Sequence, residues 1–384
     1  MRRTLGLLLV FVQSLLAARV VWRLARTGRD VPIRSVPPGS TEPGAVAVIV
    51  PALNEAHRLE PCLEGLLAFG NEVGEIMIVD GGSTDGTRDL VRTYAGRDRR
   101  LRLVEAGRAP EDWNGKVWGL AAGARALGSG AQWLLTLDSD VRPAPALARS
   151  LVARAERRRL RLLSVATAQR LSGAVEGLLH PAFLATLVYR FGRPSGATRT
   201  PGLALANGQC CLIRSDLLHE LGGFQALRDS LCEDITLARL AARGGDAVGF
   251  YESDALIDVA MYADWRDAWD NWPRSLTTRD GLFGVAGWLG LVELVLVQAL
   301  PLPLLLSRWP TAGAVRRVNV LLLTIRLGML VGMARAYPSR PWTFWLSPLL
   351  DLPAGFALWR SALRTRHMWR SRAVTRQKGL LVAL

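Results

Sequence analysis

The strongest constraint on the fold is a regular alternation of short apolar segments with helix-length segments in the first half of the chain. The apolar segments have the length of buried strands, and the segments between them are long enough for crossover helices. We expect strands at 46–50, 75–80, 101–106 and 133–138, and helices at 55–69, about 85–95 and about 115–127. This alternation predicts an α/β fold with a mostly parallel, doubly wound sheet.

Polar turns follow three of the four expected strands. PALNE (51–55), DGGSTDGT (80–87) and DSD (138–140) each begin where an apolar run ends. Ligands of doubly wound folds bind at the carboxyl ends of the strands. Three Gly- or Asx-rich turns at one edge of a sheet therefore predict a nucleotide-binding crevice.

The charge of the chain is concentrated outside this central region. The 384 residues carry a formal net charge of +15, of which 1–44 contribute +5, 45–270 contribute −2 and 271–384 contribute +12. A nucleic-acid-binding protein would place its basic excess on the folded domain, so we expect no nucleic acid partner. The Arg-rich stretch 154–161 is expected to be a solvated helix face.

The basic flanks also contain the longest apolar runs, at 5–18, 282–306, 318–334 and 342–359. Runs near 20 residues are long enough to cross a bilayer. The first run is either a cleaved signal peptide or an uncleaved anchor. Because Arg19, Arg23, Arg26 and Arg29 follow it, against Arg2 and Arg3 before it, the positive-inside rule favours an anchor that keeps the downstream domain in the cytoplasm.

These features predict a multi-pass membrane protein whose segments follow one another along the chain. We expect a transmembrane anchor at 1–29, a Pro/Gly/Ser linker at 30–44, a catalytic domain at 45–257, an amphipathic interfacial region at 258–281, transmembrane or re-entrant helices at 282–361 and a basic cytoplasmic tail at 362–384. If the domain and the tail are both inside, an even number of spans lies between them. The run at 342–359, broken by Pro348, Asp351 and Pro353, is then expected to be re-entrant or interfacial.

The four cysteines, Cys62, Cys210, Cys211 and Cys232, include no CxxC pair. This spacing predicts reduced, mostly buried thiols. It does not predict a disulfide framework or a zinc site.

Asp138 and Asp140 are the first candidate functional residues. Two like charges one residue apart on a strand point the same way and repel each other. They are either ordinary caps of a turn or ligands of a cation. At the end of a buried strand, two hard oxygen ligands suit Mg²⁺ or Mn²⁺ bound to a diphosphate.

Lys116 and the pair Glu233–Asp234 are the next candidates. Lys116 is one of only two lysines among 48 basic residues and lies at an expected helix start. It is either a surface lysine or a point-charge contact to phosphate. Glu233 and Asp234 are either acids favoured by the dipole of a helix N-terminus or include a general base for an incoming hydroxyl.

Tryptophans recur at helical spacing in ADWRDAWDNWPRS (263–275). Trp265, Trp269 and Trp272 are expected to share one face of a helix, which packs on the domain or lies at the membrane interface. We favour the interface, because the segment directly precedes a long apolar run. Arg274 would then lie near the membrane and could reach a phosphate.

Taken together, these stretches resemble the family-2 glycosyltransferases, which have the GT-A fold. VAVIVPALNEAHRL, IMIVDGGSTDGT, WNGKVWGL, LLTLDSDV, NGQCCLIRSD and CEDITLARL occur in the order of that family over roughly 45–280. The membrane-anchored layout is similar to lipid-modifying members, including the carotenoid- and hopanoid-associated glycosyltransferases. The ceramide glucosyltransferases are more distant relatives.

The resemblance implies a role for each matching residue. Pro51 and Glu55 would lie at the donor, with Glu55 on the ribose and Asp80 on the nucleobase. Lys116 would neutralise the diphosphate, Asp138 would contact the nucleotide or sugar, and Asp140, with Asp138, would bind the metal. Gly208 and Gln209 would line the sugar pocket, and Asp234, beside Glu233, would be the base. The processive synthases carry Gln-x-x-Arg-Trp, whereas this chain has Asn-Trp-Pro-Arg-Ser at 271–275, so Arg274 is retained without the following Trp and processive synthesis is not expected.

The expected activity is inverting transfer of one sugar from a nucleotide-diphosphate sugar of the UDP-glucose type to a hydroxyl of a membrane lipid, such as a carotenoid or hopanoid. The expected cofactor is Mg²⁺ or Mn²⁺, and the expected location is the bacterial inner membrane with the catalytic domain in the cytoplasm. Two alternatives remain open. One is a polyprenyl-phosphate sugar synthase of the same fold, and the other is a membrane scaffold with a degenerate, non-catalytic nucleotide domain.

Overall fold

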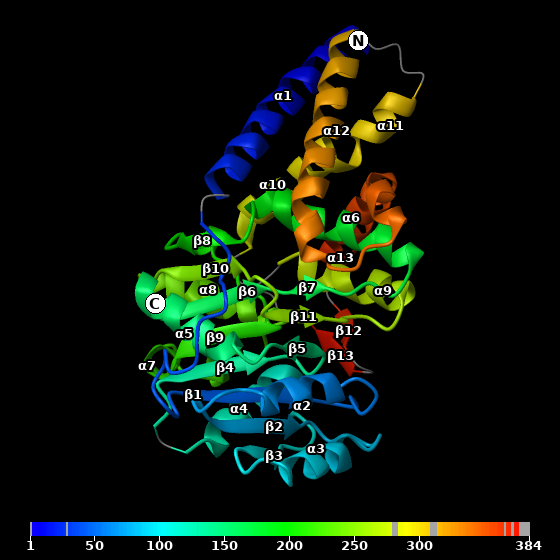
Figure 1. Ribbon diagram of the computed structural model, residues 1–384. Coiled ribbons are helices and arrows are strands. Elements are labelled where there is room, and N and C mark those ends of the chain that lie inside the picture. The colour runs from blue at the N-terminus through cyan, green and yellow to red at the C-terminus, as the bar shows by residue number, and fades with distance from the viewer. Residues whose placement is uncertain are drawn as a thin grey trace. The chain divides into compact units, whose positions relative to one another are not determined.

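The computed structural model describes residues 2–27, 30–128, 130–278, 283–307, 313–364, 366–369 and 372–375 (Figure 1). The chain divides into two compact units. Of the described residues, 2–27 and those within 169–193 and 262–375 form the helical unit, and those within 30–168 and 194–261 form the sheet unit. The segment 169–193, which the sequence placed inside the catalytic domain, therefore groups with the apolar helices.

An eight-stranded sheet forms the centre of the sheet unit. Its strands, in sheet order, are β3 (Leu101–Glu105), β2 (Val73–Asp80), β1 (Val46–Ala52), β4 (Trp133–Leu137), β9 (Cys210–Arg214), β6 (Leu162–Ala166), β10 (Val248–Glu252) and β8 (Ser195–Thr198). Strand β9 runs antiparallel to β4 and β6, and β8 runs antiparallel to β10, whereas the other neighbours are parallel. The α/β class is confirmed. The sheet is mixed rather than mostly parallel, because β9 is inserted between β4 and β6.

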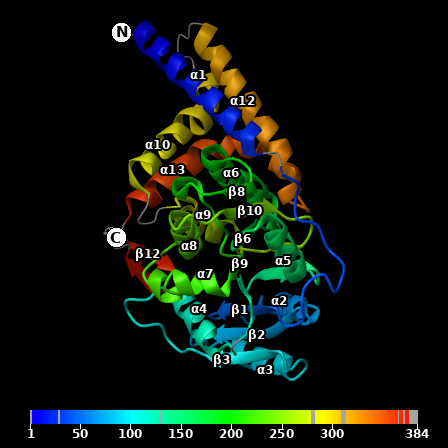
Figure 2. The ribbon, with the colours of Figure 1, turned by 90° about the vertical axis from the view of Figure 1, so that its left-hand side faces the viewer.

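Helices cover both faces of this sheet (Figure 2). Along β1, Val46, Val48 and Val50 belong to one apolar core, while Ala47 and Ile49 belong to the other, as the two-residue period of a strand requires. The first core includes side chains of α2 (Glu60–Leu67), α3 (Thr87–Ala95) and α5 (Leu147–Arg158). The second includes side chains of α4 (Gly115–Ala126), α7 (Ser215–Glu220), α8 (Glu233–Arg243) and the 3-10 helix η2 (Phe224–Leu227). The central strands are thus buried on both faces, which explains their continuous apolar sequences.

Short elements complete the sheet unit. Strands β5 (Val141–Pro143) and β11 (Ile257–Val259) pair antiparallel, η1 (Pro201–Leu203) is a 3-10 helix, and β7 (Ala168–Gln169) lies at the boundary of the two units. The expected helix at 55–69 is shorter, because Leu59 donates its backbone N–H to the Glu55 carbonyl in a turn and regular α-helix begins only at Glu60.

Arg154 contradicts the expectation of a solvated Arg-rich helix face. Its side chain is buried on α5, donates to the carbonyls of Val31 and Pro32, and lies over the ring of Tyr251 at 4.9 Å. Arg154 therefore fastens the linker to the sheet unit. The pattern of charges alone could not show this, because a long Arg stem can cross an apolar surface to reach buried carbonyls.

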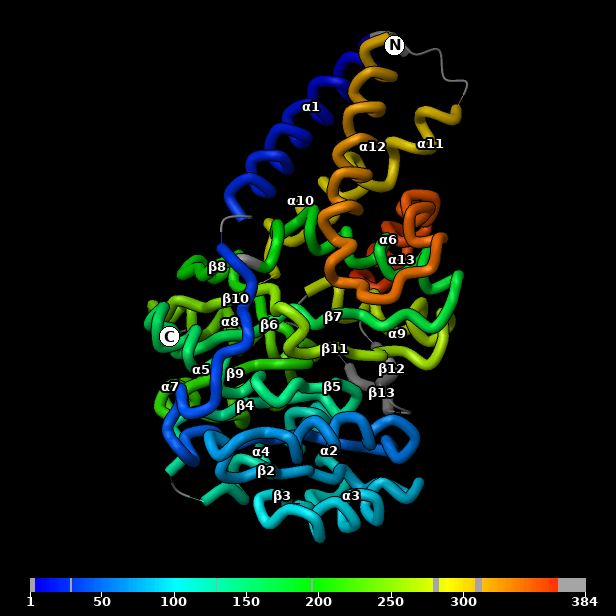
Figure 3. The backbone as a smooth tube through the Cα atoms, viewed as in Figure 1, coloured from blue at the N-terminus to red at the C-terminus, as the bar shows by residue number. Residues whose placement is uncertain are grey.

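The helical unit consists mainly of helices of very different length (Figure 3). In chain order its elements are α1 (Arg2–Thr27), α6 (Ala174–Phe191), α9 (Trp265–Leu276), α10 (Gly284–Leu294), the π-helix η3 (Val295–Ala299), α11 (Pro301–Leu306), α12 (Gly313–Met333), the 3-10 helices η4 (Ala334–Ala336) and η5 (Trp342–Leu350), α13 (Asp351–Leu363), and the strands β12 (Arg366–Trp369) and β13 (Arg372–Thr375). Within the described residues, three helical segments are long and apolar enough to cross a membrane: Thr4–Thr27, Gly284–Leu306 and Gly313–Ala336. The run at 342–359 is not among them and forms η5 and α13 instead. Of the expected basic tail, residues 376–384 lie outside the described part of the chain.

Polar contacts join the apolar helices to one another. Gln13 of α1 donates from Nε2 to Asn319 Oδ1 of α12 at 3.1 Å, and Arg23 Nη1 lies 3.0 Å from Glu293 Oε1 of α10. Arg326 Nε of α12 lies 2.9 Å from Asp351 Oδ2 of α13. Buried polar groups in an apolar bundle need partners, so these pairs fix which helices are neighbours.

Candidate active site

The turns after β1 and β2 are joined by hydrogen bonds at the edge of the sheet. Asn54 donates its backbone N–H to Ser83 Oγ at 2.8 Å and accepts from the Thr84 N–H at 2.9 Å, while Glu55 donates its N–H to Thr87 Oγ1 at 2.9 Å. Asn54 has a φ of 56°, a left-handed conformation that Asn tolerates better than most residues. Two of the three predicted polar turns therefore form one connected loop structure.

Asp80 is the last residue of β2 and is nearly inaccessible to solvent. Its carboxylate accepts from the backbone N–H groups of Gly82 and Ser83, both at 3.1 Å, and lies 3.9 Å from Arg88 Nε. The turn thus holds the carboxylate in one orientation beside the crevice. Its expected contact with the nucleobase stays a prediction.

Arg58 links two acidic side chains, those of Glu55 and Asp140. Its guanidinium donates to both carboxylate oxygens of the buried Glu55, and its Nη1 donates to the Met261 carbonyl at 3.2 Å and lies 3.7 Å from Asp140 Oδ2. Arg58 was not predicted as a site residue, because an Arg within an expected helix is not unusual in this Arg-rich chain.

Lys116 connects the acidic groups on the other side of the site. Its Nζ lies 2.7 Å from Asp138 Oδ1 and 2.7 Å from Glu233 Oε1, and it donates to the Gly208 carbonyl at 3.2 Å. Burial disfavours the charge on Lys116, but Asp138, Glu233 and Asp234 outweigh this effect and raise the pKa of its ammonium group above the ordinary value. Lys116 is therefore a largely covered side chain whose charged form is favoured, and not an ordinary surface lysine.

The helix start that carries Lys116 is held by an asparagine. Asn114 accepts from the Lys116 backbone N–H at 2.9 Å and donates from Nδ2 to the Ser230 carbonyl at 2.8 Å. It thereby caps α4 and ties it to the loop before α8. The sequence analysis did not single out Asn114, although an Asn directly before a helical Gly-Lys is a capping signal.

Asp234 and Glu233 form the first turn of α8. Asp234 Oδ2 accepts from the Gly208 backbone N–H at 2.7 Å, which binds the helix to the segment before β9. Burial, reinforced by the neighbouring Glu233, raises the pKa of Asp234 to about 7. The helix-terminus interpretation of these acids agrees with the geometry, and the role of Asp234 as a general base stays a prediction.

Gly208 and Gln209 lie between these groups. A Cβ on Gly208 would stand 2.6 Å from Lys116 Nζ and 3.0 Å from Glu233 Oε1, so any larger residue would displace the ends of these side chains. Gln209 is buried, and its side-chain oxygen accepts from Thr167 Oγ1 and from Asn207 Nδ2. The structure thus brings Gly208 into contact with Lys116, Glu233 and Asp234, and packs Gln209 beside them.

Asp138 and Asp140 follow β4 directly, and their surroundings fit a divalent cation. Asp140 Oδ1 is buried and has no hydrogen-bond partner in the described part of the chain, and burial together with Asp138 raises the pKa of Asp140 to about 7. Among the described residues no three His, Cys, Asp or Glu side chains converge as a complete metal site. Two carboxylates with further ligands from a diphosphate match the oxygen chemistry of Mg²⁺ and Mn²⁺.

The remaining expected residues lie in different surroundings. Pro51 belongs to β1 and pairs with Val79 of β2. Cys62 is buried, and burial, reinforced by Asp140 and Asp138, raises the pKa of its thiol far above the ordinary value, so it is no nucleophile. All four cysteines are buried, as expected.

The tryptophans of α9 do not share one exposed face. Trp272 is buried against His180 and Phe183, with ring centroids at 4.7 and 5.8 Å, and Trp269 also contacts Phe183 at 5.8 Å, whereas Trp265 is exposed. Trp272 therefore packs against α6 within the helical unit, which corrects its expected position at a lipid surface. Arg274 also lies on α9 in the helical unit, and its contact with the diphosphate stays a prediction.

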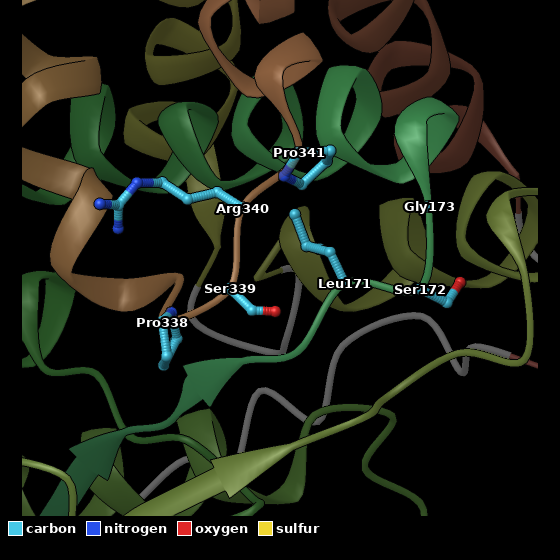
Figure 4. A pocket seen from close by; sticks show the side chains of 7 residues that line it. All are labelled: Leu171, Ser172, Gly173, Pro338, Ser339, Arg340 and Pro341. Carbon is cyan, nitrogen blue, oxygen red and sulfur yellow. The ribbon is translucent and has the colours of Figure 1, made fainter.

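The helical unit has a surface pocket (Figure 4). It is lined by Leu171, Ser172, Gly173, Pro338, Ser339, Arg340 and Pro341. Arg340 Nη1 donates to the carbonyls of Ala334 and Tyr337, so its guanidinium stabilises the local turn that contains it. No candidate catalytic side chain lines this pocket.

The mixed α/β sheet thus carries Asp138 and Asp140 directly after β4, beside Lys116 of α4. Residues 47–222 match the model of the family described as Glycosyl transferase family 2. This matched segment covers just under half of the chain and resembles that family, and the α/β fold is the GT-A fold that the sequence predicted.

Known proteins similar to this chain are glycosyltransferases or proteins of polysaccharide synthesis. The succinoglycan biosynthesis protein ExoA of Rhizobium meliloti is 34% identical over 96 residues, which cover 24% of this chain and 27% of the relative. The glycosyltransferase AglE of Haloferax volcanii is 26% identical over 100 residues, which cover 26% of this chain and 31% of the relative. The chain thus spans about a third or less of the length of these relatives.

One solved structure is similar over nearly its whole length. The mannosyltransferase PcManGT from Pyrobaculum calidifontis, in complex with GDP-Man and Mn²⁺, aligns with a TM-score of 0.56 at 20% identity, covering 94% of this chain and 99% of that chain. At this identity the likeness establishes the fold.

Proposed function

We propose that this protein is an inverting glycosyltransferase that moves one sugar from a nucleotide-diphosphate sugar, of the UDP-glucose type, to a hydroxyl of a membrane lipid such as a carotenoid or hopanoid. The observation that carries the proposal is the cluster at the strand ends. Lys116 bridges Asp138 and Glu233, and Asp234 lies beside them on the Gly208 backbone. The family match and the glycosyltransferase relatives support the same reaction class.

The proposed chemistry is a direct displacement at the anomeric carbon. Asp234 takes the proton of the acceptor hydroxyl as its oxygen forms the new bond, and the bond to the diphosphate breaks on the opposite face of the sugar, which inverts the configuration. Lys116 stabilises the negative charge that develops on the leaving diphosphate. Asp138 and Asp140 would hold Mg²⁺ or Mn²⁺, which supplies further charge neutralisation when bound.

The lipid acceptor is proposed from the helical unit. Three described helices have the length and composition of membrane spans, and exposed apolar side chains line them. Arginines at the domain-proximal end of α1 favour a sheet unit on the cytoplasmic side of the inner membrane of a bacterium. A lipid acceptor would then reach the transferase domain without leaving the bilayer.

The test is nucleotide release by the detergent-purified full chain. A panel of UDP- and GDP-sugars is supplied with Mn²⁺ and a neutral lipid extract, and wild type is compared with Asp234→Asn. The matched control is Asp89→Asn, the same change at a site with an 81% exposed side chain on α3. We expect lipid-dependent release that is lost in Asp234→Asn and kept in Asp89→Asn.

Other outcomes favour the alternatives. Release that requires a polyprenyl phosphate and survives Asp234→Asn indicates a polyprenyl-phosphate sugar synthase, because that acceptor is already an anion. Failure to bind any nucleotide in the presence of Mn²⁺ indicates a non-catalytic domain. Mass spectrometry of the lipid product identifies the acceptor when transfer occurs.

A further inference from the structure

We propose that Arg58 makes metal binding depend on nucleotide binding, by occupying the Asp140 carboxylate until a diphosphate draws the guanidinium away. This inference rests on the proposed function and concerns the same site. Arg58 is a positioning residue in this role, because it acts through Asp140. Nothing in the sequence motifs assigned it a function.

The geometry places Arg58 between two acidic groups. Its Nε and Nη2 donate to Glu55, so that side of the guanidinium is fixed by a bidentate pair. Its Nη1 is divided between the Met261 carbonyl at 3.2 Å and Asp140 Oδ2 at 3.7 Å. Only the Nη1 end has to change partner for Asp140 to be released.

Burial makes the competition between Arg58 and a metal ion strong. The side chain of Arg58 is 22% exposed and that of Asp140 is 9% exposed, so water screens their charges poorly. A divalent ion that coordinates Asp140 on its own would stand within a few ångströms of the guanidinium charge and be repelled by it. The unpartnered Oδ1 of Asp140 offers a ligand atom, but this repulsion opposes its use.

The carboxylate of Asp138, the other expected metal ligand, is also held by a basic side chain. Asp138 Oδ1 lies 2.7 Å from Lys116 Nζ, so each expected metal ligand has a basic side chain on one oxygen. A diphosphate changes this balance, because it is an anion that accepts hydrogen bonds from both guanidinium and ammonium groups. Nucleotide and metal then bind more tightly together than either does alone, and the effect is reciprocal by linkage.

The experiment measures Mn²⁺ binding rather than turnover. Free Mn²⁺ is followed by electron paramagnetic resonance in titrations of the detergent-purified full chain, with and without saturating UDP or GDP. Arg58→Gln removes the charge, Arg58→Lys keeps a charge, and Arg97→Gln is the matched control, since the Arg97 side chain is 51% exposed and pairs with Glu64. Thermal unfolding checks that each variant is folded, and Arg58→Met, which keeps an apolar stem, replaces Arg58→Gln if that variant is not.

We expect nucleotide to tighten Mn²⁺ binding to wild type by at least about 5-fold, the lower end of typical couplings. Arg58→Gln is expected to bind Mn²⁺ alone at least about 5-fold more tightly than wild type and to lose most of the coupling. Arg97→Gln is expected to behave like wild type. Arg58→Lys, which keeps the charge but cannot form the bidentate pair with Glu55, is expected to lie between wild type and Arg58→Gln.

Two results would overturn the inference. One is equal Mn²⁺ affinity of wild type with and without a nucleotide that does bind, and the other is an Arg58→Gln variant whose affinity for Mn²⁺ alone is unchanged or weaker. Failure of every nucleotide to bind counts against the proposed function instead. The titrations with Mn²⁺ alone still decide the role of Arg58 in that case.

Discussion

Gly208 is the residue on which the arrangement of the site depends most directly. Its carbonyl accepts from Lys116 Nζ, and its N–H donates to Asp234. One peptide segment therefore positions both the buried cation and the proposed base. A side chain at this position would enter the space that Lys116 occupies.

The Gly208→Ala variant is expected to lose activity while remaining folded. The new Cβ would stand 2.6 Å from Lys116 Nζ and 3.4 Å from Asp234 Oδ2, so the lysine has to shift. Displacement of such a group by about 1 Å can lower the rate by roughly 100-fold, and we expect kcat/KM to fall at least about 10-fold. Gly202→Ala is the control, because no atom lies within 4 Å of the added Cβ. Equal activities of the two variants would contradict the assigned packing.

The pH dependence of the reaction follows from Asp234. Its pKa is raised to about 7, and the proposed base acts only when deprotonated, so kcat/KM is expected to rise with pH through about 7 and then level off. Asp140, whose pKa is also raised to about 7, changes charge in the same direction. Because a bound metal favours the charged form of its ligand, the limb that persists at saturating Mn²⁺ reports Asp234. A pH-independent kcat/KM between about 6 and 8 would argue against Asp234 as the base.

The sequence predicted the acidic groups and Lys116 because their chemistry is unusual for their positions. A Lys in an Arg-rich chain and two carboxylates at the exit of a buried strand both stand out. Arg58 does not, since 46 of the 48 basic residues are Arg and this one lies in an ordinary-looking segment. Its partners come from three separate parts of the chain, so only the folded structure identifies it.

Helix α4 carries Lys116 and packs closely on the sheet through two glycines. A Cβ on Gly123 would stand 2.6 Å from Ile49 Cγ2 and 2.9 Å from Val79 Cγ2, and a Cβ on Gly119 would stand 2.9 Å from Pro51 Cβ. Small residues on this face let the helix backbone lie directly on β1 and β2. The position of Lys116 is thus set by the packing of α4 on the sheet.

Gly123→Ala is expected to destabilise the protein, although alanine favours helices. Overpacking costs about 1–3 kcal/mol, which exceeds the gain of about 1 kcal/mol in helix propensity. The change is measured by denaturant unfolding followed by circular dichroism. Gly328→Ala in α12, where no atom lies within 4 Å of the added Cβ, serves as the helical control and is expected to show no loss. A more stable Gly123→Ala variant would show that the helix can move away from the sheet.

An element was predictable when its own sequence determines its form. It was not predictable when its form depends on contacts with distant parts of the chain. The first four strands of the chain are continuous apolar runs bounded by polar turns, and the structure has all four. The antiparallel course of β9 depends on which strands it joins, which its own sequence does not encode. Likewise, helical spacing placed Trp265, Trp269 and Trp272 on one helix, but only the contact with α6 decides that Trp272 is covered by protein.

The three candidate spans allow one arrangement of the whole chain that keeps the sheet unit in the cytoplasm. Among the described residues, one candidate span precedes the unit and two follow it, and the common cytoplasmic side of the domain and the tail stays a prediction. Polar pairs join α1 to α10 and α12 within the helical unit. This arrangement places the start of α1 outside the cell.

Cysteine labelling tests the orientation in intact cells. We expect Thr4→Cys to react with a membrane-impermeant maleimide, and Arg97→Cys on the sheet unit to react only after the cells are permeabilised. The four native cysteines are buried, so wild type is a suitable unlabelled background. Labelling of Arg97→Cys but not Thr4→Cys in intact cells would reverse the proposed topology.

The near-absence of lysine gives the protein an unusual chemical property. Lys116 is the one lysine of the sheet unit's described residues, and it is buried and held in its charged form, which does not react with acylating reagents. An activated ester will therefore not acylate Lys116 in the folded transferase domain until the lysine leaves its two carboxylates. Acylation at this single position thus offers a covalent record, readable by peptide mass spectrometry, of how often the site opens.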